Sequence, residues 1–174
     1  MKVIETSYKG YRFRSRAEAR WAVFFDAAGI EYEYEKEGFE LPSGRYLPDF
    51  WLPGPRSWFE VKGSSPNDAE MILALELAEY SHSPVWIGHG PVTFEGHRIV
   101  ACHDYGGVIN RDQRFMDDRK HDGSIWISNE ISARSISGSK YSDRWPHPMS
   151  GCFVNRCFDT AKSARFEFGE CGAR

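Results

Sequence analysis

Residues 46–62 read YLPDFWLPGPRSWFEVK. Two runs rich in aromatic residues, Tyr46–Leu52 and Trp58–Lys62, flank Pro53-Gly54-Pro55-Arg56, whose prolines and glycine are typical of a turn. The stretch therefore predicts a β-hairpin.

The predicted hairpin brings two carboxylates together. Asp49 and Glu60 are equidistant from Gly54-Pro55, so a turn centred there places them opposite each other, with Cβ atoms about 5 Å apart. Like charges in this position destabilise a hairpin unless a cation lies between them. Lys62 falls on the same strand face as Glu60, because side chains alternate along a strand. One face of the hairpin is therefore expected to carry two carboxylates and an ammonium.

This residue set suits phosphodiester hydrolysis, which needs an activated water, a Lewis acid and neutralisation of growing negative charge. Asp49 and Glu60 offer hard oxygen ligands for Mg²⁺, with Mn²⁺ as a substitute, and the backbone carbonyl of Val61 is a further candidate ligand. Lys62 could orient or deprotonate the attacking water, or stabilise the transition-state charge. The sequence does not separate these roles.

Regular elements are predicted on both sides of the hairpin. Ser15 and Glu18 have the spacing of a capping box, which predicts a helix that Gly29 ends. Pro66 is expected at the first position of a second helix. The predicted elements are a helix over 15–28, strands over 30–35, 46–52 and 58–62, a helix over 66–80, and strands over 84–88 and 93–101.

Pro48-Asp49 followed by Glu60-Val61-Lys62 resembles the signature of the PD-(D/E)XK nuclease superfamily, and the order of elements over residues 8–90 is similar. The resemblance implies an α/β fold: a restriction-endonuclease-like core with a central mixed β-sheet flanked by helices. It also implies magnesium-dependent cleavage of nucleic acid, and we expect the cleavage to be endonucleolytic and to act on DNA. A helix before the hairpin often adds a carboxylate in this superfamily, and Glu18 has the matching place, so the catalytic set is Asp49, Glu60, Lys62 and Glu18. The chain is also similar in style to small nucleases of bacteriophages and mobile elements.

The net charge of −3 does not by itself indicate a nucleic-acid-binding protein, but the charges are unevenly distributed. Arg12, Arg14 and Arg16 lie just before the helix that carries Glu18, where a scissile phosphate would be held. We expect at least one of them to contact DNA, with RNA as the alternative substrate. The competing interpretations are solvated surface arginines and a Glu18 that serves only as a helix cap.

The sequence divides into a predicted nuclease core over residues 1–103 and an irregular C-terminal extension over residues 104–174 of unknown role. The extension is Ser-rich and mixed in charge, apart from a helix predicted over 158–168. It is expected to shape substrate choice or to form an interface in a homodimer.

Other classes of protein find little support. The spacing of His147, Cys152, Cys157 and Cys171 fits no strong zinc pattern, so free thiols are expected. The first residues lack the apolar core of a signal peptide and no apolar run reaches a membrane span, so we expect a cytoplasmic protein without a membrane partner. A rival hypothesis is a non-catalytic nucleic-acid- or protein-binding module, such as a phage factor that blocks a host defence.

Overall fold

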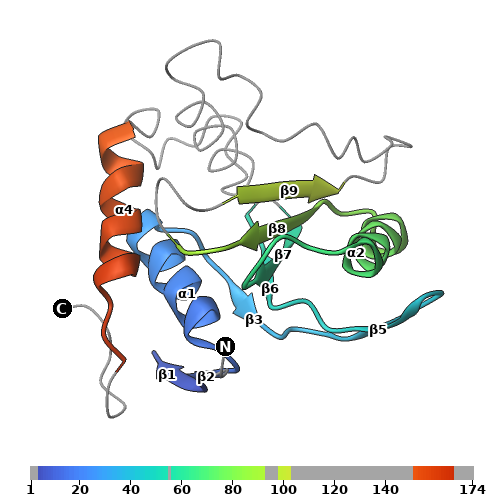
Figure 1. The fold of residues 1–174 in the computed structure, drawn as a ribbon, viewed down its shortest axis with the longest axis horizontal. Coiled ribbons are helices and arrows are strands. Elements are labelled where there is room, and N and C mark those ends of the chain that lie inside the picture. The colour runs from blue at the N-terminus through green and yellow to red at the C-terminus, as the bar shows by residue number, and fades with distance from the viewer. Residues whose placement is uncertain (1–3, 55, 93–97, 103–150, 167–174) are drawn as a thin grey trace.

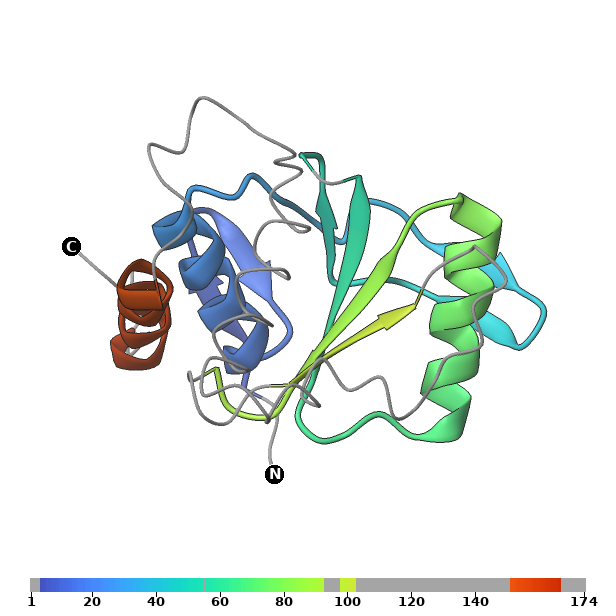
Figure 2. The same cartoon turned by 90° about the horizontal axis from the view of Figure 1, so that it is seen from above.

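The computed structural model describes residues 4–54, 56–92, 98–102 and 151–166, with the backbone alone for 98–102 and 151–154. The described part is an α/β fold in which a mixed five-stranded sheet lies between helices (Figure 1). Helices α1 and α4 lie on one side of the sheet and α2 lies on the other, as Figure 2 shows from above. The predicted α/β class is confirmed.

The sheet has the strand order β3-β6-β7-β8-β9. Strands β7 and β8 are parallel, and the other neighbouring pairs are antiparallel. The parallel pair requires a crossover, which α2 provides. The bounds are Glu33–Tyr34 for β3, Phe50–Leu52 for β6, Ser57–Lys62 for β7, Val85–His89 for β8 and Arg98–Cys102 for β9.

Helix α1 (Arg16–Ala28) begins and ends where the sequence predicts. The Ser15 hydroxyl caps it by accepting the Glu18 N–H, and Gly29 ends it in the left-handed conformation, with φ of 68°. Its apolar face, including the fully buried Trp21, packs on the sheet and on α4 (Gly151–Ser163). The largest hydrophobic core of the described residues lies in this layer.

Glycine at position 88 permits the closest contact in this core. A Cβ there would lie 2.7 Å from the Phe59 ring and 2.8 Å from the Trp21 ring, closer than real Cβ atoms approach other heavy atoms. Strand β8 can therefore pass directly beneath the two rings only because residue 88 has no side chain.

Helix α2 (Asp68–Ser81) covers the opposite face of the sheet. Asn67 is its N-cap and forms a reciprocal capping box with Glu70. Pro66 therefore precedes the cap, and its predicted place at the first helical position is wrong. The second core cluster, which includes Trp58 and Leu77, lies beneath this helix.

Two short hairpins stand outside the main sheet. One pairs β1 (Thr6–Tyr8) with β2 (Tyr11–Phe13), and the other pairs β4 (Phe39–Leu41) with β5 (Gly44–Tyr46). The single strand predicted over 46–52 is therefore wrong in its first half, since Tyr46 belongs to β5 and the chain turns before β6.

The C-terminal helix differs from its prediction. It runs from Gly151 to Ser163, so it starts seven residues before the predicted start at residue 158. Phe158 stacks on Phe24 with ring centroids 4.4 Å apart, so a segment assigned to the extension contributes to the α1 core. The division at residue 103 stays a prediction, because residues 103–150 lie outside the described part.

Candidate active site

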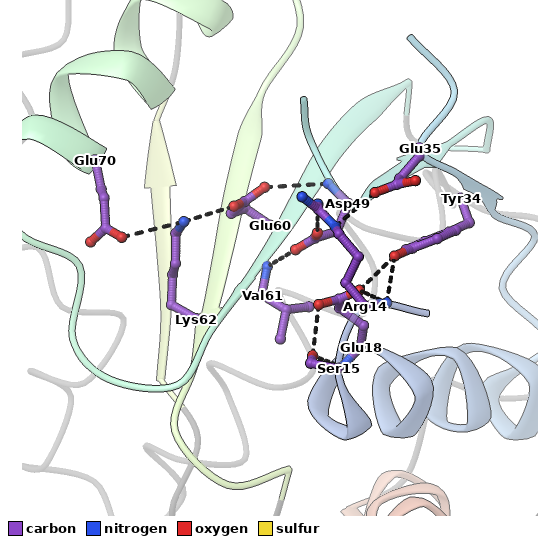
Figure 3. Close-up of polar contacts among 10 residues, drawn as sticks. All are labelled: Arg14, Ser15, Glu18, Tyr34, Glu35, Asp49, Glu60, Val61, Lys62 and Glu70. Atoms are coloured by element: carbon purple, nitrogen blue, oxygen red, sulfur yellow. Dashed lines mark hydrogen bonds and ion pairs between the residues drawn. The ribbon is translucent and has the colours of Figure 1, made fainter. Parts of the chain in front are cut away.

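The hairpin of β6 and β7 has the predicted register. Phe50 pairs with Phe59 and Trp51 with Trp58, so the next pair along is Asp49 with Glu60. The rings of Trp51 and Trp58 form a cross-strand pair, with centroids 4.6 Å apart. Asp49 and Glu60 are thereby brought together at the end of the sheet where β6 begins and β7 ends (Figure 3).

Asp49 is almost completely buried, with 2% of its surface exposed. Its Oδ2 accepts the Val61 N–H at 2.7 Å, and its Oδ1 accepts from Arg14 Nη2 at 2.8 Å. The pKa of Asp49 is nevertheless raised well above its ordinary value, first by burial and then by the neighbouring Glu60 carboxylate. Burial and the neighbouring carboxylate therefore both disfavour the ionised form of Asp49, against the contacts with Arg14 and the Val61 N–H.

Glu60 is also buried and faces the backbone of Asp49, whose N–H it accepts at 3.3 Å. Burial raises its pKa, although Lys62 opposes this shift. Lys62 Nζ lies 2.9 Å from Glu60 Oε1 and 3.3 Å from Glu70 Oε1 on α2. Burial lowers the pKa of Lys62, but the two carboxylates outweigh it and the net pKa is raised, so the ammonium form is favoured.

Glu18 makes a local network on the α1 side of the site. Its Oε1 accepts from the Ser15 hydroxyl at 2.6 Å, and its Oε2 accepts from the Tyr34 hydroxyl at 2.6 Å and from the Arg14 N–H at 3.0 Å. The Glu18 carboxylate thus accepts a hydrogen bond from the backbone N–H of residue 14. The capping-box pattern of the sequence predicts instead a bond from the N–H of residue 15. Glu18 still acts electrostatically on Asp49, whose pKa it helps to raise.

The three candidate phosphate-binding arginines separate in the structure. Only Arg14 reaches the carboxylates; it also pairs with Glu35, at 2.7 Å from Nε to Oε1. Arg12 forms an ion pair with Glu5, and the exposed Arg16 begins α1. Arg12 and Arg16 therefore flank the site without entering it.

Three neighbours of the site are not predicted as site residues by the sequence: Tyr34, Glu35 and Glu70. The alternating run over residues 30–35 indicates a strand, and pairing of that strand with β6 is what brings Tyr34 and Glu35 beside Asp49. No local pattern predicts this pairing. Glu70 is marked by its first-turn position in α2, which explains it without a site role.

The donors available to a metal are two carboxylates and a backbone carbonyl. Successive carbonyls along a strand point to opposite edges, and that of Lys62 accepts from Gly90 on the β8 side. The Val61 carbonyl accordingly points to the other edge, where Asp49 lies. Among the described residues, no group of three His, Cys, Asp or Glu side chains is placed to hold a metal ion.

The remaining candidate ligands are only partly described. Of the Cys/His set near the C-terminus, only Cys157 has a described side chain; it is buried in the α1–α4 core. His147 and Cys171 lie outside the described residues. In the described ranges, no helix is both long and apolar enough to cross a membrane.

Comparison of the chain with protein-family models, with curated proteins and with solved structures gives no match. Function is therefore inferred from the geometry of the site.

Proposed function

We propose that the chain is a metal-dependent nuclease that hydrolyses phosphodiester bonds of DNA, on a restriction-endonuclease-like core of the PD-(D/E)XK type. The observation that carries the proposal is the pairing of buried Asp49 with buried Glu60, next to Lys62. Two buried carboxylates side by side at one end of the sheet are unfavourable for stability alone. A bound cation would offset the free-energy cost of burying the two carboxylates next to each other.

The order of elements gives further support. Helix α1, which carries Glu18, precedes the hairpin β6–β7, and α2 then crosses over to the parallel strand β8. This is the order that the resemblance to the PD-(D/E)XK superfamily implies. The catalytic set proposed from the resemblance, Asp49, Glu60, Lys62 and Glu18, lies in one region of the fold (Figure 3).

The residues fit a divalent metal by the chemistry of their donors. Asp49, Glu60 and the Val61 carbonyl would hold Mg²⁺, or Mn²⁺ in its place, since magnesium commonly uses one or two carboxylates and retains waters. Burial raises the pKa values of Asp49 and Glu60, and the Glu60 carboxylate raises that of Asp49 further, so a bound cation would favour their ionised forms. When bound, the metal supplies Lewis acidity at the phosphoryl oxygen and a more acidic water.

Protein groups supply the remaining charge. Lys62 is held as an ammonium by Glu60 and Glu70, which favours stabilisation of the developing negative charge and orientation of the attacking water. Arg14 would contact the phosphate: its guanidinium is half-exposed and lies 2.8 Å from Asp49 Oδ1, which supports this role. Glu18 fixes the backbone of Arg14 through its N–H.

The test is cleavage of closed circular and linear DNA in Mg²⁺ by the purified chain and by three variants: Asp49→Asn, Glu60→Gln and Lys62→Met. We expect nicking of the circle, which reports endonucleolytic action, and a loss of at least roughly a hundredfold in each variant. Glu40→Gln and Lys36→Met are matched controls, since both residues make exposed ion pairs elsewhere.

The results separate the proposal from its rivals. Cleavage that persists in Asp49→Asn would show that the activity does not belong to this site. Magnesium binding without cleavage of DNA, but with cleavage of RNA, would move the chemistry to the other nucleic acid. Nucleic-acid binding that is unchanged by Mg²⁺ and by all three variants would favour a non-catalytic binding module.

A further inference from the structure

Arg14 is held in place by its backbone and by its side chain. Its N–H donates to Glu18 Oε2 and to the Tyr34 hydroxyl, each at 3.0 Å, directly before the cap of α1. The side chain then extends over the carboxylate pair, with Nη2 on Asp49 and Nε on Glu35 (Figure 3). Arg14 is thus fixed at both its backbone and its side chain, although half of the side chain is exposed.

The oxygen that Arg14 binds is the one a metal would need. Asp49 Oδ2 already accepts the Val61 N–H at 2.7 Å, which leaves Oδ1 as the oxygen better able to take a metal ligand bond. Arg14 Nη2 lies 2.8 Å from this Oδ1. A divalent cation on Oδ1 would repel a guanidinium at that distance, so the two cations compete for one carboxylate oxygen.

Glu35 provides a second attachment for the arginine. Its N–H donates to the Asp49 carbonyl at 2.8 Å, and its φ of 45° is a left-handed conformation that a glutamate rarely adopts. Glu35 therefore has this uncommon backbone conformation, and its side chain binds Arg14 Nε. An arginine that leaves Asp49 would thus stay tethered through Nε, with both Nη groups available for a new ligand.

We propose that Arg14 is a metal-displaced phosphate ligand: it neutralises Asp49 until a divalent cation takes that oxygen, and then binds a backbone phosphate of the nucleic acid. The inference rests on the proposed metal-dependent nuclease function. It makes metal binding and phosphate binding cooperative, because the cation releases the group that the phosphate requires. The half-exposed side chain can make this movement without disturbing the core.

The first test is calorimetric titration with Mg²⁺ alone. Arg14→Gln should bind Mg²⁺ roughly five- to tenfold more tightly than the unaltered chain, because the competing cation is gone. Arg12→Gln, which removes the same charge from the exposed pair with Glu5, should bind within about twofold of it. Asp49→Asn should not bind.

The outcomes distinguish the two proposals. An Arg14→Gln variant that binds Mg²⁺ no more tightly than Arg12→Gln, while Asp49→Asn abolishes binding, would overturn the role of Arg14 and leave the metal centre intact. If Arg14→Gln is the one protein of the set that binds Mg²⁺ measurably, the result would support the displacement of Arg14 by the metal. Absence of Mg²⁺ binding in every protein would overturn both proposals.

The second test measures affinity for a short DNA duplex with and without Ca²⁺, which supports binding while disfavouring cleavage. Arg14→Gln should weaken binding roughly tenfold in Ca²⁺ and little in its absence. Glu35→Ala should weaken DNA binding in Ca²⁺ as well, but should not tighten Mg²⁺ binding. Equal losses with and without Ca²⁺ would make Arg14 an ordinary phosphate contact and overturn the displacement.

Discussion

Glu70 joins helix α2 to the candidate catalytic lysine. Its Oε2 accepts the Asn67 N–H at 2.8 Å and completes the capping box, while its Oε1 lies 3.3 Å from Lys62 Nζ. One carboxylate therefore caps a helix and positions a side chain of the site. The first turn of α2 and the end of β7 are fixed relative to each other by this contact.

Removing the charge of Glu70 should lower catalysis without changing substrate affinity. In Glu70→Gln we expect kcat to fall roughly tenfold with KM unchanged, because Lys62 is less well positioned. Steady-state kinetics on DNA measure this split. Asn67→Ala is the control: it removes the other bond of the capping box, in which Asn67 Oδ1 accepts the Glu70 N–H, at about 1 kcal/mol, and it leaves Lys62 untouched. An equal fall of kcat in Asn67→Ala would assign the effect to the position of the helix.

Ser15 and Glu18 allow helix capping to be separated from site charge. Ser15→Ala should lower the free energy of unfolding by about 1 kcal/mol and leave Mg²⁺ affinity unchanged. Glu18→Gln removes a negative charge that acts on Asp49, so it should weaken Mg²⁺ binding by roughly three- to tenfold. Urea denaturation and calorimetry measure the two effects. Mg²⁺ affinity that is identical in both variants would make Glu18 purely a cap.

Gly88 should tolerate no side chain. Gly88→Ala places a methyl group against Phe59 and Trp21, and we expect the free energy of unfolding to fall by about 1–3 kcal/mol. Gly63→Ala is the matched control, since a Cβ there meets no atom within 4 Å. Urea denaturation of both variants provides the comparison, and equal stability would contradict the close approach of β8 to the two rings.

Cys157 should couple stability to alkaline pH. Burial raises the pKa of its thiol to about 11, so the folded state keeps the proton longer than the unfolded state does. Its contribution to stability is therefore complete below the ordinary pKa, near 9, and is lost as the pH rises towards 11. Thermal unfolding from about pH 7 to 11 should show this loss in the unaltered chain and less of it in Cys157→Ala.

A reagent for thiols gives an independent check on the same residue. At about pH 8 the buried Cys157 should react slowly, so Cys157→Ala and the unaltered chain should show the same number of fast-reacting thiols. One fast thiol fewer in the variant would mean that residue 157 is accessible and that α4 does not stay packed on α1.

The site could be predicted as far as local sequence determines geometry. The turn at Gly54-Pro55 fixes a register, and the register fixes that Asp49 faces Glu60. The cap at Ser15 and the stop at Gly29 are likewise local, and α1 begins and ends accordingly. Each of these predictions depends on residues close together in the chain.

The unpredicted contacts depend on pairing between distant segments. Arg14 meets Asp49 across 35 positions in the chain, and Glu35 reaches both because β3 adds to the sheet beside β6. A single sequence does not specify which strand will be the neighbour of another. Residues 31–40 contain five glutamates and one lysine. Without knowledge of the neighbouring strand, this charge pattern indicates only a solvated face.

The packing of α4 on α1 has a consequence for how the protein is made. A nascent chain that has reached Gly90 already contains Asp49, Glu60 and Lys62, yet α1 still has a bare apolar face. In the described part of the chain this is the face on which α4 packs, with Phe158 stacked on Phe24. The contact between α1 and α4 thus joins segments that are synthesised at different times, and until it forms, the aromatic surface of α1 is a natural target for chaperones.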